Sequence, residues 1–184
     1  VFLSCGDCAE QTQLTQEKPR RFNSADLASV KTQIGPVIPG LHQGAVPQGL
    51  TYDSSSRRVL ISHYFEKLPS CVSILDGQSG RLVSTVALNE PSGKPHNGHA
   101  GGIAVAEKSL FVASDGRVLQ YELSPFLYDS PPVSLAAKGT RQCETEASFC
   151  SATSDLLLVG EFAYGSDYPT DVSHHLKDRQ GVRK

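Results

Sequence analysis

Five side chains that could bind a metal or transfer protons stand next to the ends of short apolar runs. They are His63, His99, Asp115, Glu146 and Glu161. Imidazole and carboxylate groups brought together can hold a divalent ion such as Ca²⁺ or Zn²⁺, or act as general acid and base. We take His63, His99 and Glu161 as candidate catalytic residues, and His99 and Glu161 as candidate metal ligands. The alternative is that each is a polar residue satisfied by neighbouring backbone groups.

Two pairs of histidines need separate treatment. His96 and His99 have H-x-x-H spacing, but their loop contains Pro and Gly, so no helix holds both rings on one face. His99 is favoured because it comes before Gly101–Gly102, where missing side chains let another backbone or a ligand approach closely. His96 is expected in solvent. Side chains of the neighbours His174 and His175 diverge, so at most one, taken as His174, faces the same site.

Aromatic side chains follow the last apolar run. Tyr164 and Tyr168 lie in a long loop that also carries acidic residues. Their rings could stack on a sugar or another flat ligand, and the alternative is that they pack over the rim of a sheet. Both are therefore included among the candidate ligand-binding residues.

The elements that must position these side chains form a repeat. From Val46 onward, short runs rich in Val, Ile, Leu, Phe and Tyr end at turn residues, which predicts strands. Leu50, Ile103 and Phe149 stand at equivalent positions, spaced by 53 and 46 residues. The predicted strands are 48–53, 58–63, 71–76 and 81–88 in the first copy, 101–106, 109–114 and 116–122 in the second, and 147–152 and 155–161 in the third.

Four antiparallel strands in each copy are typical of a β-propeller blade. The repeat therefore predicts an all-β chain that forms a partial β-propeller, with about two and a half to three four-stranded blades of a six- or seven-bladed ring. The blades are expected at 46–98, 99–145 and 146–184, the last incomplete. A lead-in segment is expected at 1–45, with a short helix predicted at Asn23–Val30. A β-sandwich remains the alternative.

The propeller prediction explains how residues far apart in the chain could meet. Residues that precede each first strand and residues that end each second strand should open on the same mouth of the channel, because adjacent strands run antiparallel. The candidate site residues occupy these positions. We therefore expect them to line one mouth.

The segment CVSILDGQSGRLVSTVAL resembles the outer hairpin of YVTN, NHL and quinoprotein-like propellers, in which an Asp-x-x-x-Gly turn joins two strands. The segments VPQGLTYD, GHAGGIAV and LLLVGEF, the last followed by His174–His175, resemble secreted bacterial-type propellers. This similarity, which includes gluconolactonase-like propellers, covers roughly residues 46–184. It implies a fold more than a function. It also raises the alternative of a metal-dependent hydrolase of the lactonase or esterase type, in which carboxylate and Asn ligands hold calcium. The predicted mouth offers no clear Asn ligand.

Composition excludes several classes of protein. The 184 residues carry 17 basic and 19 acidic side chains, a net charge of -2, so the basic excess typical of nucleic-acid binding is absent. No apolar run approaches the roughly 18 residues of a membrane-spanning helix. The chain contains no Met and starts at Val1, which suggests a processed terminus and export from the cytoplasm.

Five cysteines would allow two disulfides and one free thiol in an oxidising compartment, and the sequence leaves their pairing open. They are Cys5, Cys8, Cys71, Cys143 and Cys150. The spacing of Cys5 and Cys8 also occurs in redox and zinc sites, with a loop disulfide or unpaired thiols as the alternative.

We therefore expect an exported propeller segment that acts as a binding or interaction platform, with a mouth lined by His63, His99 and Glu161. The ligand is expected to be a small molecule or a glycan. The alternatives are the metal-dependent enzyme described above and a structural subunit of a larger assembly. Three blades cannot close a ring, so a remainder of the same protein, a second chain or a second copy should complete it.

Overall fold

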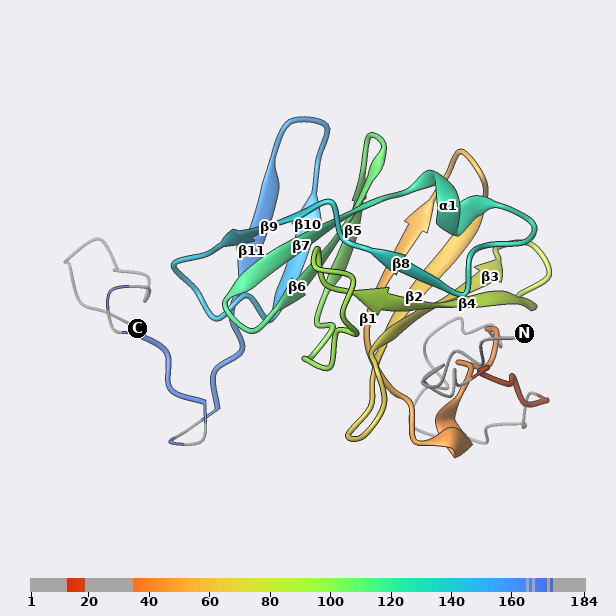
Figure 1. Cartoon of the computed structure of the whole chain (residues 1–184), viewed down its shortest axis with the longest axis horizontal. Coiled ribbons are helices and arrows are strands. Elements are labelled where there is room, and N and C mark those ends of the chain that lie inside the picture. The colour runs from red at the N-terminus through yellow and green to blue at the C-terminus, as the bar shows by residue number, and fades with distance from the viewer. Residues whose placement is uncertain (1–12, 19–34, 165, 167, 172, 174–184) are drawn as a thin grey trace, which may run out of the picture.

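The computed structural model describes residues 13–18, 35–164, 166, 168–171 and 173 (Figure 1). Strands account for most of its regular structure, which confirms the all-β prediction. The strands form three separate sheets, and within the described residues they do not close into a barrel. The helix predicted at Asn23–Val30 lies outside the described residues.

The first sheet contains four consecutive antiparallel strands and one strand from later in the chain. The four are β1 (Val46–Asp53), β2 (Arg58–Tyr64), β3 (Cys71–Asp76) and β4 (Leu82–Asn89), each within two residues of its predicted ends. The short strand β8 (Ser134–Ala136) then adds to β4 in parallel. The sequence did not predict β8, because its three residues show too little alternation to indicate a strand.

Turn chemistry explains why β3 and β4 form a hairpin. One carboxylate oxygen of Asp76 accepts hydrogen bonds from the backbone N–H and the hydroxyl of Ser79, both at 2.8 Å. Gly80 then adopts a φ of 68°, which a residue with a side chain rarely takes. The Asp-x-x-x-Gly segment therefore forms the predicted turn between these strands.

The second sheet repeats the same antiparallel order. Its strands are β5 (Ile103–Ala106), β6 (Ser109–Ser114), β7 (Arg117–Glu122) and β9 (Gly139–Gln142). The first three correspond to the predicted strands, and β9 is a fourth strand that the sequence did not predict. The four-residue helix α1 (Ser124–Leu127) lies between β7 and β8.

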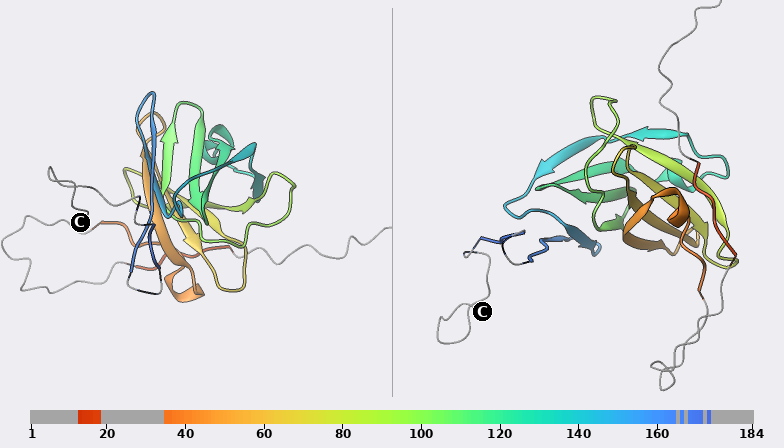
Figure 2. Two further views of the ribbon diagram at one scale, coloured as in Figure 1. Left: turned by 90° about the vertical axis from the view of Figure 1, so that its left-hand side faces the viewer. Right: turned by 90° about the horizontal axis from the view of Figure 1, so that it is seen from below.

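The third sheet is a hairpin of β10 (Phe149–Ala152) and β11 (Leu157–Gly160). The second sheet, green in Figures 1 and 2, lies between the first and third sheets, and β5 contacts both β1 and β10. The first strands of consecutive sheets are therefore neighbours. A single-turn 3-10 helix, η2 (Leu41–Gln43), precedes the first sheet.

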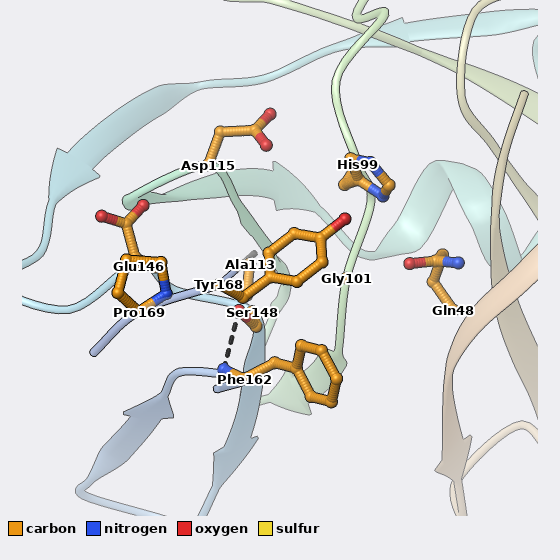
Figure 3. Close-up of a pocket in the computed structure, with 10 residues that line it drawn as sticks. All are labelled: Gln48, His99, Gly101, Ala113, Asp115, Glu146, Ser148, Phe162, Tyr168 and Pro169. Carbon is orange, nitrogen blue, oxygen red and sulfur yellow. Dashed lines mark hydrogen bonds between the residues drawn. The ribbon is translucent and has the colours of Figure 1, made fainter. Parts of the chain in front are cut away.

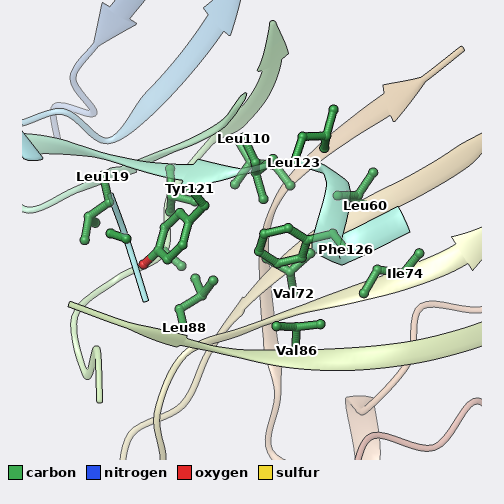
Figure 4. Close-up of a cluster of buried hydrophobic side chains, with 14 residues drawn as sticks. Leu60, Val72, Ile74, Val86, Leu88, Leu110, Leu119, Tyr121, Leu123 and Phe126 are labelled. Carbon is green, nitrogen blue, oxygen red and sulfur yellow. The ribbon is translucent and has the colours of Figure 1, made fainter. Parts of the chain in front are cut away.

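Apolar side chains fill the space between the first and second sheets (Figure 4). Leu60, Ile74 and Val86 of the first sheet belong to one buried cluster with Leu110 and Tyr121 of the second. The alternation of apolar residues along these strands places them on the shared face. Burial of this cluster holds the two sheets together.

Smaller clusters lie on either side of this core. Ala104, Ala113, Ala147 and Cys150 are buried between the second and third sheets, where small side chains allow close approach. Leu14, from the described part of the lead-in, packs in another cluster with residues of the first sheet. Part of the predicted lead-in therefore belongs to the folded body.

Glycines bring the first strands of neighbouring sheets together. A Cβ atom on Gly49 would lie 2.6 Å from the carbonyl oxygen of Gly101, and one on Gly102 would lie 2.7 Å from the backbone nitrogen of Cys150. These distances are shorter than real Cβ contacts allow. The prediction that another backbone approaches Gly101–Gly102 is therefore confirmed.

Candidate functional site

One pocket of about 550 Å³ opens where the three sheets meet (Figure 3). Most of the residues that line it precede first strands, follow second strands, or lie in the segment after β11, whereas Gln48 lies within β1 and Ala113 within β6. They are Gln48, His99, Gly101, Ala113, Asp115, Glu146, Ser148, Phe162, Tyr168 and Pro169. Four of the predicted site residues, His99, Asp115, Glu146 and Tyr168, therefore share one pocket.

His99 lies in the loop before β5 and is held by an aromatic contact. Its imidazole stacks on the ring of Tyr64, with centroids 4.1 Å apart and 12° between the planes. Tyr64 is the last residue of β2, so the stack joins the first sheet to the loop that enters the second. The ring nitrogens of the exposed His99 side chain can exchange hydrogen bonds with a ligand.

Two carboxylates, Asp115 and Glu146, contribute acidic groups to the pocket. Asp115 adopts a left-handed φ of 47°, directly before Gly116. The backbone N–H of Gly116 donates to the carbonyl oxygen of Glu146 at 2.8 Å, which ties the two acidic loops together. None of the ten lining residues is Lys or Arg, so the lining is acidic.

Glu161 holds the loops beside the pocket in place but is not one of the lining residues. Its carboxylate accepts a hydrogen bond from the backbone N–H of Glu146 at 3.3 Å and contacts the hydroxyl of Thr170. The backbone N–H of Phe162 donates to the hydroxyl oxygen of Ser148 at 3.0 Å (Figure 3). These bonds attach the segment after β11 to the start of the third sheet.

The aromatic residues of this segment form a small cluster. The ring of Phe162 meets Tyr168 edge to face at a centroid distance of 5.6 Å and stacks on Tyr164 at 6.4 Å. Tyr164 and Tyr168 are bridged by two backbone hydrogen bonds of 3.0 and 3.1 Å. Tyr168 lines the pocket, whereas Tyr164 is exposed outside the pocket lining.

The structure places His63 inside the first sheet and outside this pocket lining. The side chain is fully buried, and its Nε2 atom lies 2.8 Å from the hydroxyl oxygen of Ser73. Burial lowers the pKa of His63 to about 4. The pairing of β1 with β2 and of β5 with β6 makes His63 equivalent to the buried Ser114. The next residue, Tyr64, stacks on His99. His174 lies outside the described residues.

The expectation that His96 lies in solvent is wrong. Its side chain is only 1% exposed, with Nδ1 2.7 Å from a carboxylate oxygen of Glu90 and Nε2 3.2 Å from the hydroxyl of Ser114. Its backbone N–H donates to the carbonyl oxygen of Leu88 at 2.9 Å, so the loop folds back along the end of β4. Neighbouring Pro and Gly suggested an exposed loop, and the sequence carried no local signal for this buried network.

The residues described here offer little support for a metal centre. Among them, no three His, Cys, Asp or Glu side chains are grouped closely enough to hold one ion. Glu161 is bonded to the loop backbone, and His99 stacks on Tyr64. The predicted metal pair of His99 and Glu161 is therefore not supported by a complete ligand set.

The three cysteines within the described ranges, Cys71, Cys143 and Cys150, form no disulfide. Cys71 and Cys150 are buried, and burial raises the pKa of their thiols to about 12 and about 11, respectively. The other two cysteines, Cys5 and Cys8, lie outside the described residues.

The chain matches no protein-family model and no curated protein. In the part of the chain that the structure describes, none of the helices is long and apolar enough to cross a membrane.

Proposed function

We propose that the chain is a binding platform and that the pocket between the three sheets is its ligand site. One observation carries this proposal: His99, Asp115, Glu146 and Tyr168 come from separate loops and line a single pocket of about 550 Å³. This volume lies in the range of sites for small organic molecules. The lining combines aromatic surface with a few polar groups, which is typical of such sites.

The chemistry of the lining favours a neutral or cationic ligand. Asp115 and Glu146 would repel an anion, and no Lys or Arg lines the pocket to offset them. Carboxylates accept hydrogen bonds from hydroxyl or amino groups, while Tyr168 and Phe162 offer rings on which an apolar or flat face can stack. Sugars and organic amines both fit this description.

The architecture that would carry this site is a partial propeller. Support comes from the repeated antiparallel order of the first two sheets and from the contact of β5 with both β1 and β10. The third sheet exposes Phe149, Leu156 and Leu158, each more than half exposed. We expect a further sheet of an exported propeller, from the same protein, a second chain or a second copy, to cover these side chains.

Ligand-observed NMR with a library of saccharides and small organic amines tests the binding function. Tyr168→Ala should weaken binding of a true ligand by about 3–10-fold through loss of ring contact, and Asp115→Asn should weaken binding of amines most. Tyr128→Ala and Glu66→Gln change exposed residues that do not line the pocket and serve as matched controls. Hits that respond equally to the control and pocket variants would argue against this site.

A further inference from the structure

A chain of hydrogen bonds runs from the interior to the Asp115 carboxylate at the pocket. A carboxylate oxygen of Glu90 lies 2.7 Å from Nδ1 of His96, and Nε2 of His96 lies 3.2 Å from the hydroxyl oxygen of Ser114. The Ser114 hydroxyl donates to Oδ2 of Asp115 at 2.8 Å. His96 and Ser114 are each only 1% exposed, so the bond between them is shielded from solvent, whereas Asp115 at the end of the chain is exposed.

The number of protons on these groups determines which group donates each hydrogen bond and which accepts it. Ionised Glu90 can only accept, so Nδ1 of His96 must donate to it. Ser114 has one hydroxyl proton, and ionised Asp115 can only accept it, so the bond between them exists only when Ser114 donates to Asp115. Nε2 of His96 must then donate to the Ser114 oxygen for all three bonds to exist. The complete chain therefore requires a doubly protonated His96 ring.

A neutral His96 ring produces a different arrangement. With a proton on Nδ1 only, Nε2 becomes an acceptor and can take the Ser114 hydroxyl proton in a hydrogen bond. Oδ2 of Asp115 then loses its donor. The protonation of His96 thus decides whether Ser114 donates to the pocket carboxylate or to the ring.

Other charged or titratable groups lie close to His96 and its hydrogen-bond partners. Arg117 of β7 donates to both carboxylate oxygens of Glu90, at 2.8 and 3.1 Å. Burial tends to raise the pKa of Glu90, but hydrogen bonds from His96 and Arg117 outweigh it and leave the pKa below its usual value. The nearby phenol of Tyr121 bonds to the carbonyl oxygen of Asn89, and burial raises its pKa, so it stays neutral. Asp115 is the other charged group that faces this chain.

Gly98 makes room for the chain. A Cβ atom there would overlap Oδ2 of Asp115 and lie 2.9 Å from Cε1 of His96 and 3.0 Å from the Ser114 hydroxyl oxygen. The carbonyl oxygen of Gly98 accepts a hydrogen bond from the Ser70 hydroxyl at 2.6 Å, which keeps this loop in place. The close packing of these groups depends on the absence of a side chain at position 98.

We infer that Ser114 and His96 are positioning residues for Asp115, and that the protonation state of His96 switches the Ser114 hydroxyl between Asp115 and the ring. Ser, His and Glu also form catalytic triads. In this structure, however, the Ser114 hydroxyl is buried, so it is not presented to a substrate as a nucleophile. The inference rests on the proposed function only in taking the pocket as the ligand site.

NMR titration of the full chain without ligand tests this inference. The ¹⁵N shifts of His96 report the protonation of each ring nitrogen, and the ¹³Cγ shift of Asp115 reports changes at its carboxylate. His99→Gln is used as the background, so that the other imidazole at the pocket does not contribute. We expect the Asp115 signal to show an inflection at the pH where His96 loses its second proton.

Variants at position 114 test whether the Ser114 hydroxyl transmits the change from His96 to Asp115. The alternative is that Asp115 responds directly to the charge on His96. Ser114→Ala should abolish the Asp115 inflection, and Ser114→Thr should retain it because the hydroxyl remains. An inflection that is absent in the His99→Gln background, or unchanged in Ser114→Ala, would overturn the inference. An absent inflection in the background titration overturns the inference whether or not a position-114 variant folds. No ligand is involved, so a failed ligand screen would leave the result intact.

Discussion

The imidazole of His99 lies almost parallel to the ring of Tyr64, with 4.1 Å between the centroids. The contact joins the end of β2 in the first sheet to the loop that enters the second sheet. His99 therefore enters the pocket with one ring face already covered by an aromatic residue from the neighbouring sheet. Tyr64 orients a candidate ligand-binding residue although it is not among the residues that line the pocket.

Removing the Tyr64 ring should release His99. We expect Tyr64→Ala to lower the free energy of unfolding by about 0.5–1.5 kcal/mol beyond the loss of buried area, while Tyr64→Phe retains the stack. Urea unfolding gives the energy, and the His99 side-chain NMR signals report ring mobility. Equal His99 mobility in the Ala and Phe variants would contradict the proposed role of Tyr64.

Acid should destabilise the protein through His63. Because burial lowers the pKa of His63 to about 4, its ring stays neutral in the folded protein, whereas the unfolded chain takes up a proton near pH 6.5. Stability should therefore fall as the pH drops from about 6.5 to about 4, by roughly 3 kcal/mol. Urea unfolding at pH 7 and pH 4.5 measures the loss.

The double variant His63→Leu/Ser73→Ala tests the source of this pH dependence. It removes the imidazole together with its hydrogen-bond partner, so no buried hydroxyl is left unpaired at that bond. We expect a smaller loss of stability between pH 7 and pH 4.5 than in the unaltered protein. His42→Gln, at an exposed histidine, is the control and should retain the full loss. The same pH dependence in all three proteins would exclude His63 as the cause.

Because β5 and β10 approach each other closely, we expect a methyl group at position 102 to lower the stability of the protein. A Cβ atom on Gly102 would lie 2.7 Å from the backbone nitrogen of Cys150 and 2.8 Å from Cβ of Phe149. Gly102→Ala should therefore cost about 1–3 kcal/mol of stability as the sheets move apart. Gly139→Ala places its methyl group in open space and should be neutral or slightly stabilising. Equal melting temperatures for the two variants would contradict the close packing.

Thiol alkylation should distinguish the three described cysteines. The thiolate is the reactive form, and burial raises the pKa of Cys71 to about 12 and of Cys150 to about 11. Cys143 is only half-buried. With iodoacetamide at pH 8, peptide mapping by mass spectrometry should show Cys143 modified at least about tenfold faster than the other two. Denaturant should remove this difference, and rapid native modification of Cys71 would contradict it.

Local patterns predicted most of the strands. The ends of β1 to β4 lie within two residues of their predicted positions, because alternating apolar residues and turn residues act within a single hairpin. The strands β8 and β9 escaped prediction because they depend on pairing with β4 and β7. A segment of three or four residues carries too little sequence pattern to show that it pairs with a strand distant in the chain.

The candidate site was predicted in part. Three of the residues that were grouped by their places at strand starts and ends, His99, Asp115 and Glu146, line one pocket. The same grouping failed for His63, because a change of one residue along a strand turns a side chain to the other face of the sheet. It also missed His96, whose burial depends on backbone bonds to Leu88 and Ser70 in another part of the first sheet.

By itself, the sequence determined the all-β class, the order of most strands and the turns between them, since these depend on interactions between residues close in the chain. Only the tertiary structure decided which polar side chains reach the pocket and which are buried in the interior of the protein. His96 and His99 are three residues apart, yet one is buried in a hydrogen-bonded chain and the other is exposed beside Tyr64. That difference arises from packing between sheets, and packing depends on neighbours that the local sequence does not contain.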